Sequence, residues 1–360
     1  MRPKFSKFAI IAAAATVFVA GTVSVQAKDS RYSLGSLAEG TTPFLVNTAW
    51  ANAVNKYVPG HKVQVSAVGA ATRHALLVSK GKMDFTMYGP GLYFLMYQQI
   101  GPYRKHKEGP QTVKKISTLF SYPMGFYHPV VYESSGIKNF RDIKGKKVFL
   151  GPPAGVATRN ARLIVEAMTG YLPGRDYQQV KLGWGPAQTA FQDKKFDVWI
   201  TNTMAPSPAV SQLVLTNKIR LLPLDSKNFS HKSWKRYVGS PGTVRTKIDP
   251  KVYGKNLMNK EPILATGSFV GLAVRSDMDA DLVYKMMKAF WDHIDEAHAM
   301  SKSMSKTLTL KLAVAGMSDP VHPGALRYYK EKGINIETPY KLTLAQREAF
   351  RNRAKKRKRK

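Results

Sequence analysis

The 360-residue sequence contains no cysteine. This absence excludes disulfide bonds and a cysteine nucleophile. It also excludes lipid attachment to a cysteine behind a leader peptide, so we expect an exported form of the chain to diffuse freely rather than to be a lipoprotein. Hydrophobic residues make up 44% of the chain and aromatic residues 11%. A chain of this length and composition can build a core without disulfides.

Long apolar runs are absent after residue 27. The start of the chain has three basic residues within seven positions, then the uncharged run Phe8–Val25, then a small residue at Ala27. This order predicts a cleavable secretory signal peptide over residues 1–27, with cleavage after Ala27, and a periplasmic location. The alternative is a retained membrane anchor. The alanine-rich run and the triplet Val25–Ala27, which has small residues at the two positions that a signal peptidase requires, disfavour it.

Acidic residues are scarce. The chain has 23 Asp and Glu against 56 Lys and Arg, a formal net charge of +33. Such a protein attracts phosphate surfaces, anionic lipids, acidic polymers or a small anionic ligand. Export argues against a specific nucleic acid partner. The tail Lys355–Lys360 is a candidate contact for an anionic membrane or cell-wall surface, and the alternative is a solvated end.

Catalytic and cofactor motifs are also missing. The sequence has no phosphate-binding loop that ends in Gly-Lys-Ser/Thr, no dinucleotide fingerprint and no Gly-x-Ser-x-Gly turn. His293 and His298 are five residues apart, a spacing that does not place two ligands on one helical face. His322 precedes Pro-Gly and is expected to be structural. We therefore expect no metal, no cofactor and no enzymatic activity.

What is present is an alternation of short apolar strands and helical segments, which is typical of an α/β protein. Strands are expected over residues 31–36, 61–67, 85–88, 146–151 and 177–184, and helices over 43–57, 72–79, 159–168, 185–192 and 280–298. The turn "GKMDFTMYG" is echoed by "DKKFDVWITN", which places Asp84 and Asp197 in similar positions. The echo indicates two similarly built lobes with mixed sheets flanked by helices.

Two extended segments are expected to connect these lobes. They begin at Phe126 and at Gly267, and a double crossing of this kind makes a hinge. The expected organisation is a signal peptide (1–27), lobe one (28–127 plus 265–345), lobe two (128–264) and a basic helix end with its tail (346–360).

Three turns share one design. "LAEGTTP", "VGAATR" and "PPAGVATR" each lead from a strand end to a helix start, where backbone N–H groups and the helix dipole favour an anion. Arg73 and Arg159 are the expected carboxylate contacts, and Thr72 and Thr158 the expected hydrogen-bond donors. The alternative is that these are ordinary connecting turns with capping threonines and solvated arginines.

Aromatic residues at strand ends are candidate walls of the same site. Trp184 stands between two glycines, and Tyr88 precedes Gly89. Trp199 and the cluster Gly91–Tyr97 are weaker candidates, because most aromatic side chains belong to the core.

A family resemblance rests on longer stretches. "SSGIKNFRDIKGKKVFLGPPAGVATRNARLIVEAMTG", "KKFDVWI", Pro206–Pro208 and "HPGALRYYKEKGI" together resemble the TAXI family, the extracytoplasmic solute-binding subunits of TRAP transporters. The resemblance implies a hinged, two-lobed periplasmic binding protein (type II-like) that closes on a small organic anion, a carboxylate or an amino acid, and delivers it to the TRAP membrane permease. It places ligand loops at Ala38–Thr42, Gly69–Arg73, Tyr88–Gly89 and Pro153–Arg159.

The loops contain fewer glycines and hydroxyl groups than is usual in that family, so the ligand identity stays open. Glu39 is a candidate partner for a cationic group of a zwitterionic ligand. Two other functions remain open: a sensor subunit that presents its ligand to a membrane kinase, and a polyanion-binding or surface-binding exported protein. The candidate ligand-binding residues are Ala38, Glu39, Gly40, Thr41, Thr42, Gly69, Ala70, Thr72, Arg73, Tyr88, Pro153, Ala154, Gly155, Val156, Thr158, Arg159, Trp184 and Thr203.

Overall fold

The computed structural model describes residues 29–336 apart from 107–108, 154 and 318. The predicted signal peptide and the basic tail lie outside the described residues. The strands are β1 (Ser30–Gly35), β2 (His61–Ser66), β3 (Phe85–Tyr88), β4 (Ile116–Tyr132), β5 (Lys147–Phe149), β6 (Gln178–Val180), β7 (Val198–Thr203), β8 (Ile219–Leu221), β9 (Thr243–Ile248) and β10 (Ile263–Arg275). The helices are α1 (Thr42–Tyr57), α2 (Ala71–Ser79), α3 (Pro90–Tyr97), α4 (Gly109–Val113), α5 (Val156–Thr169), α6 (Trp184–Gln192), α7 (Pro208–Thr216), α8 (Lys232–Val238), α9 (Ala280–Trp291), α10 (Ile294–Met300), α11 (Lys302–Thr307), α12 (Leu310–Ala315) and α13 (Pro323–Glu331), with a 3-10 turn η1 (Gly101–Tyr103).

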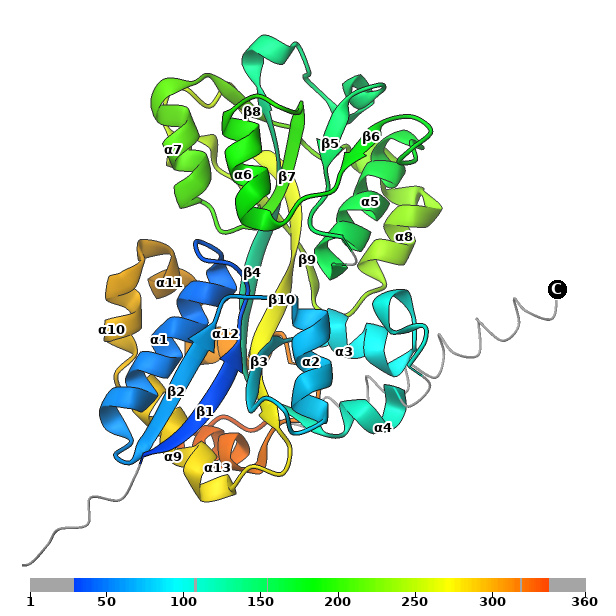
Figure 1. Cartoon of the computed structure of the whole chain (residues 1–360). Coiled ribbons are helices and arrows are strands. Elements are labelled where there is room, and N and C mark those ends of the chain that lie inside the picture. Colours follow the sequence, from blue (N-terminus) through cyan, green and yellow to red (C-terminus); the bar gives the residue numbers. More distant parts are fainter. Residues whose placement is uncertain (1–28, 107–108, 154, 318, 337–360) are drawn as a thin grey trace, which may run out of the picture.

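One mixed sheet runs through the whole molecule. Its ten strands include the path β2-β1-β3-β10-β4-β7-β5-β6, with β8 beside β4 and β9 beside β10. The long strands β4 and β10 run antiparallel to each other, and both pass from one lobe to the other (Figure 1). Helices flank the sheet in each lobe, so the predicted α/β class is confirmed. We use lobe one for the part that contains β1–β3 and α9–α13, and lobe two for the part that contains β5–β9.

Each lobe has its own hydrophobic core. In lobe one, apolar side chains from Leu34–Met124 and from Val270–Tyr329 form a single buried cluster. In lobe two, one cluster lies under α5 and α8, and another lies under α6 and α7 on the opposite face of the sheet. The chain therefore builds most of one core, then the other, and returns to complete the first.

The sequence echo between the lobes has a structural counterpart. The carboxylate of Asp84, before β3, accepts a hydrogen bond from the backbone N–H of Ser33 in β1 at 2.9 Å. The carboxylate of Asp197, before β7, accepts one from the N–H of Lys147 at 2.7 Å, just where β5 begins. Both strand pairs are parallel. Each aspartate thus fixes a parallel strand to the neighbour that precedes it in its lobe.

Most predicted helices form, with shifted ends. Helix α5 stops at Gly170, whose φ of 78° is a left-handed conformation that glycine adopts without strain. The N-cap of α1 is Thr41 rather than Thr42, because the Thr41 hydroxyl accepts from the N–H of Phe44. The single helix expected over 280–298 is two helices. They separate at His293, whose ring stacks on Tyr57 at 3.6 Å between ring centroids.

Glycines allow β4 and β10 to approach closely between the lobes. Gly125 in β4 has φ of 130°, and a Cβ there would lie 2.2 Å from the carbonyl carbon of Thr203. A Cβ on Gly267 in β10 would lie 1.9 Å from the carbonyl oxygen of Gly125. The pairing of the two strands also shifts register between Ser268 and Phe269. A second register shift lies between Leu272 and Ala273, so the pairing of the two crossing strands is irregular at the boundary between the lobes and again within lobe one.

Candidate functional site

A cavity of about 130 Å³ lies between the two lobes. It is reached from both lobes by loops that follow β2, β3 and β5, and by the middle of β4 and β10. Its lining residues are Leu37, Gly69–Thr72, Met87–Gly89, Gly91, Leu92, Leu95, Met124, Tyr127, Pro152, Pro153, Gly155–Ala157, Arg159, Asn160, Trp184, Asn202, Ser240, Pro241, Thr243 and Ser268–Val270. An apolar cavity of about 150 Å³ accommodates a benzene ring, so a small organic molecule fits here.

Two helices begin at this cavity. Neither the N-cap of α2, Ala70, nor that of α5, Gly155, has a side-chain hydrogen bond to its helix. The backbone N–H groups in the first turn of such helices lack intrahelical acceptors and carry partial positive charge. The two helix starts come from different lobes, so an anion between them is stabilised from both sides.

Arg159 brings a full positive charge to the cavity. Its guanidinium is partly buried and donates a hydrogen bond to the Asn160 side-chain oxygen at 3.1 Å. Burial, together with the positive charges of Arg236 and Arg162, lowers its pKa to about 10. No carboxylate within the described residues pairs with it. A partly buried cation without a counter-charge is a binding group for an anionic ligand.

Polar groups of lobe two surround this cation. Asn202 is 6% exposed, and neither polar atom of its amide has a hydrogen-bond partner in the described structure. The Tyr127 hydroxyl donates to the Ala157 carbonyl oxygen at 3.3 Å. Burial raises the pKa of Tyr127, while the nearby Asn160 and Asn202 amides lower it. A buried amide without partners costs free energy unless a hydrogen-bonding group reaches it, so the Asn202 side chain is able to accept and donate hydrogen bonds inside the cavity.

The remaining wall is mostly apolar. Leu92, Leu95 and Phe269 contribute from lobe one and from the crossing strand. Trp184 lies edge-on to Phe149, with ring centroids 5.6 Å apart. Val156 at the start of α5 packs against the core of lobe one. No Asp or Glu belongs to the lining within the described residues, so the cavity offers no counter-charge to an ammonium group.

Half of the sequence-predicted residues lie at this cavity. The ones that line it are Gly69, Ala70, Thr72, Tyr88, Pro153, Gly155, Val156, Arg159 and Trp184. The ones that do not are Ala38, Glu39, Gly40, Thr41, Thr42, Arg73, Thr158 and Thr203. Ala154 lies outside the described residues.

The residues outside the cavity have other roles. Arg73 is exposed on α2, and Glu39 and Gly40 are exposed in the first loop. Thr158 turns inward, where its hydroxyl donates to the Pro152 carbonyl oxygen at 2.5 Å and stabilises the turn. Thr203 follows Asn202 in β7. Because successive strand residues point to opposite faces, the Thr203 side chain points away from the cavity that Asn202 lines.

The first loop and one aromatic candidate also differ from expectation. Thr41 caps α1, and its hydroxyl donates to the Ala38 carbonyl oxygen at 2.7 Å. Thr42 is buried at the first position of α1. Trp199 belongs to the core of lobe two, where it packs against Phe191 with ring centroids 5.7 Å apart.

Sequence reasoning missed the amides. Asn160 directly follows Arg159, and Asn202 lies inside an apolar strand, where asparagine is depleted. An asparagine within "FDVWITN" is therefore a signal that could have identified this residue. The loop around Ser240 and Thr243 carried no such signal, because only the fold brings it to the cavity.

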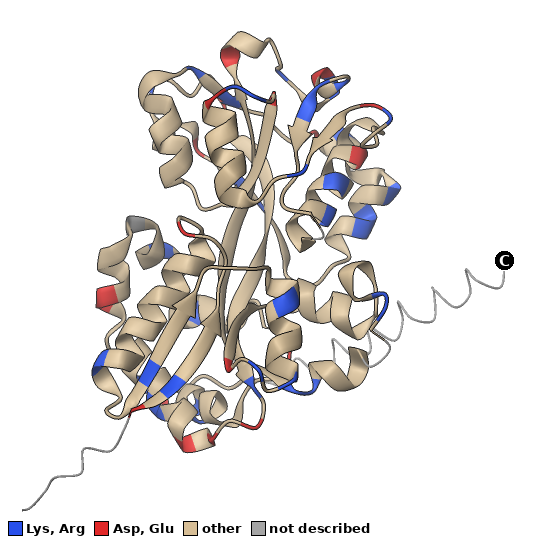
Figure 2. Cartoon of the chain, in the orientation of Figure 1, with Lys and Arg blue, Asp and Glu red and all other residues tan. Residues whose placement is uncertain are grey.

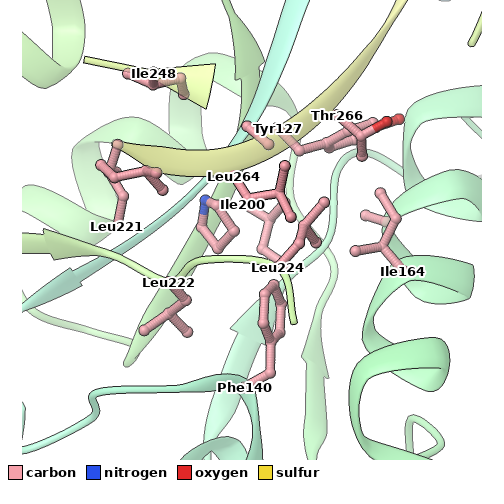
Figure 3. Close-up of a pocket in the computed structure, with 14 residues that line it drawn as sticks. Tyr127, Phe140, Ile164, Ile200, Leu221, Leu222, Leu224, Ile248, Leu264 and Thr266 are labelled. Carbon is pink, nitrogen blue, oxygen red and sulfur yellow. The ribbon is translucent and has the colours of Figure 1, made fainter. Parts of the chain in front are cut away.

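A much smaller void of about 10 Å³ lies inside lobe two (Figure 3). Apolar side chains such as Phe140, Ile164 and Leu222 surround it, and the hydroxyl of Thr266 donates to the Val244 carbonyl oxygen at 2.7 Å. A void of this size and polarity holds no organic ligand, so it belongs to the packing of the core.

The described residues contain no group of three or more His, Cys, Asp or Glu that is able to hold a metal ion. His322 is buried and caps α13: its Nδ1 accepts from the N–H of Gly324 at 3.2 Å, and its Nε2 faces the Met278 carbonyl oxygen at 3.1 Å. Across the same residues, every helix is too short or too polar to cross a membrane.

Comparison with known proteins identifies a family that the sequence matches. A sequence model of the NMT1-like family matches residues 34–333. Similar solved structures include a periplasmic aliphatic sulphonate binding protein from Escherichia coli, with 16% identity over 90% of this chain and 87% of that chain and a TM-score of 0.42. A binding protein component of an ABC phosphonate transporter from Pseudomonas aeruginosa has 13% identity over 77% and 80% of the chains and a TM-score of 0.47. A TRAP periplasmic solute binding protein from Roseobacter denitrificans with bound L-galactonate has 11% identity over 89% and 99% and a TM-score of 0.45.

Proposed function

Since this chain belongs to the NMT1-like family, we propose that it is an exported solute-binding protein that captures a small organic anion between its two lobes. The observation that carries the proposal is Arg159, a partly buried cation without a carboxylate partner, beside the unpartnered amide of Asn202. Both belong to one cavity between the lobes.

The lining selects the class of ligand. Arg159 and the N-terminus of α5 favour a carboxylate or a similar oxyanion. The apolar walls favour an aliphatic or aromatic body. An amino acid is disfavoured, because its ammonium group would be buried without a counter-charge. The expected ligand is therefore a monoanion with an apolar body.

Binding follows from the positions of these groups. The guanidinium of Arg159 donates to the anionic oxygens, and the amides of Asn160 and Asn202 add hydrogen bonds. The apolar body contacts Trp184 and Phe269. Bending of β4 and β10 near Gly125 and Gly267 brings the lobes together and removes the ligand from water.

The role in transport extends this proposal. A signal peptide over residues 1–27 places the protein in the periplasm, and the resemblance to the TAXI family favours delivery to a TRAP-type permease. In cells that lack the gene, uptake of the identified ligand is expected to be lost. A sensor subunit would instead leave uptake intact and remove the transcriptional response to the ligand.

The binding site is tested by calorimetry with a panel of monocarboxylates, with phenylacetate and hexanoate as first probes and amino acids for comparison. We expect Arg159→Gln to weaken binding by about 30-fold or more, since a charge-assisted hydrogen bond contributes about 2–3 kcal/mol. Arg73→Gln removes an arginine from the same Ala-Thr-Arg motif outside the cavity and is expected to change affinity less than about twofold. Equal losses in both variants, or none in either, contradict the assignment.

A second pair of variants separates binding from folding. Asn202→Leu removes the unpartnered amide, so we expect weaker binding by about tenfold with no loss of stability. Asn55→Leu removes an amide that accepts from and donates to the backbone of Val63, at 2.6 and 3.0 Å, and is expected to lower stability while leaving binding intact. Thermal unfolding with and without ligand measures both effects.

A further inference from the structure

A second cavity adjoins the first at the mouth of the cleft. It is more open, has a volume of about 470 Å³, and shares Gly155 and Arg159 with the first. Lobe one contributes the turn η1 and the residue that follows it, Arg104. Lobe two contributes residues of α5 and α8. The cavity therefore lies between the lobes, as the first one does.

Four arginines line this second cavity. Arg104, Arg159, Arg162 and Arg236, here called the arginine cluster, come from three separate elements, and no acidic residue is among the described lining residues. Figure 2 shows basic positions along α5 and α8. The nearest acid on α5, Glu166, lies one turn beyond Arg162 and does not line the cavity.

The cluster differs from the other basic residues because its four arginines line one cavity. Some arginines elsewhere have carboxylate partners: Arg220 pairs with Glu133 at 2.8 Å, and Arg327 with Asp281 at 2.6 Å. Arg175 and Arg275 are paired as well. Among the described residues, four other exposed or partly exposed arginines have no carboxylate partner: Arg31, Arg73, Arg141 and Arg245. Within the described part of the chain, none of the four arginines of the cluster has such a partner.

Four guanidinium groups around one cavity create a positive potential that attracts an anion. Burial is the main cause of the lowered pKa of Arg159, and the positive charges of Arg236 and Arg162 add to it. Like charges held together in this way repel each other unless an anion neutralises them. Each guanidinium is suited to bidentate contact with an oxyanion, and several together match a group with two negative charges.

We propose that the arginine cluster is a second anion-binding site, which takes a small dianionic oxyanion such as a phosphate group and bridges the two lobes. It is independent of the proposed carboxylate site except that the two share Arg159. The pocket shape, with walls from both lobes, favours a small solute over a flat charged surface.

The test uses the full mature chain and inorganic phosphate as the probe, at constant ionic strength in chloride. We expect saturable binding by calorimetry. Arg104→Gln with Arg236→Gln is expected to weaken it at least tenfold, and Arg104→Gln alone at least threefold, because Arg104 is the contact from lobe one. Both residues are exposed, and unchanged melting temperatures confirm that the variants fold.

A control pair removes the same charge elsewhere. Arg31→Gln with Arg141→Gln changes two exposed arginines that line neither cavity, and phosphate affinity is expected to stay within twofold. An equal loss in this pair, or no saturable binding by the parent protein, overturns the proposal. Binding only to vesicles of phosphatidylglycerol, with none to phosphate, also overturns it.

The same variants distinguish this proposal from the proposed function. Arg104→Gln with Arg236→Gln leaves Arg159 in place, so monocarboxylate binding is expected to change less than about threefold. If the parent protein binds phosphate but no monocarboxylate, the proposed carboxylate site is contradicted and the proposed phosphate site is supported.

Discussion

Among single residues, His128 makes stability depend on pH. It is fully buried in β4, where Nδ1 donates to the Phe126 carbonyl oxygen at 2.7 Å and Nε2 accepts from the Tyr253 hydroxyl at 2.8 Å. The Tyr253 oxygen in turn accepts from the N–H of Ser207 at 2.9 Å. The neutral ring satisfies this chain of hydrogen bonds, and burial lowers the pKa of His128 to about 4.

The sign of the effect follows from that shift. Because the pKa in the folded protein is lower than the ordinary value of 6.5, the stabilisation is complete above pH 6.5 and is lost as the pH falls toward 4. The loss is on the order of 3 kcal/mol. Urea unfolding at a series of pH values measures it. His128→Gln is expected to be less stable at pH 8 and to lose less between pH 6.5 and 4, and an unchanged slope would contradict this account.

The two Ala-Thr-Arg motifs show what the sequence does and does not reveal about single side chains. Arg159 is the fourth residue of α5, whereas Arg73 is the third residue of α2. One residue rotates a side chain by about 100° around the helix axis. Both matched motifs lie in loops that reach the cavity, but only the positions of the helix starts decide which arginine lines it.

Among elements, the crossing strands depend on glycine. A Cβ on Gly125 would lie 2.2 Å from the Thr203 backbone, and its φ of 130° is unfavourable for other residues. Gly125→Ala is therefore expected to lower the free energy of unfolding by about 3 kcal/mol or more. Denaturant unfolding measures the change.

The matched control is Gly185→Ala in α6. A Cβ there has no atom within 4 Å, and the position is helical. We expect this variant to be neutral or more stable by about 0.5–1 kcal/mol, because alanine is the better helix former. A similar loss of stability in both variants would mean that the close approach of β4 to β7 is not what restricts residue 125.

Helices and strands whose apolar residues recur with a regular spacing, or that end at a recognisable turn residue, could be predicted from the sequence. Uniformly apolar elements could not. The helix α5 has its buried residues on one face and a glycine at its end, and its existence was predicted. The helix α3, "PGLYFLMY", is buried on nearly all sides, so its sequence has no helical period that distinguishes it from a strand. It was seen only as an aromatic cluster, although Pro90 and Gly91 begin the helix that covers the cavity.

At the scale of the whole molecule, the core of lobe one is built from two parts of the chain that lie far apart in the sequence. Lobe one needs β1–β3 from the start of the chain and also β10, α9 and α13 from its last third. Lobe two is built from a nearly continuous stretch in between. Contacts between distant parts of a chain form slowly, because loop closure costs entropy before the contacts form.

This arrangement predicts an order of folding. In pulse-labelled hydrogen exchange during refolding, we expect amides of the lobe-two core, such as Val148 and Val165, to be protected before those of Leu272 and Val274 in β10. Simultaneous protection of the two groups, or earlier protection of lobe one, would contradict the prediction.

The strand β10 has a consequence for synthesis of the protein. Until residues 263–275 have left the ribosome, β3 lacks the neighbour that separates it from β4, and its edge is open. An open strand edge pairs readily with other chains. The first hundred residues are therefore expected to stay aggregation-prone until β10 has been made, which is late in translation.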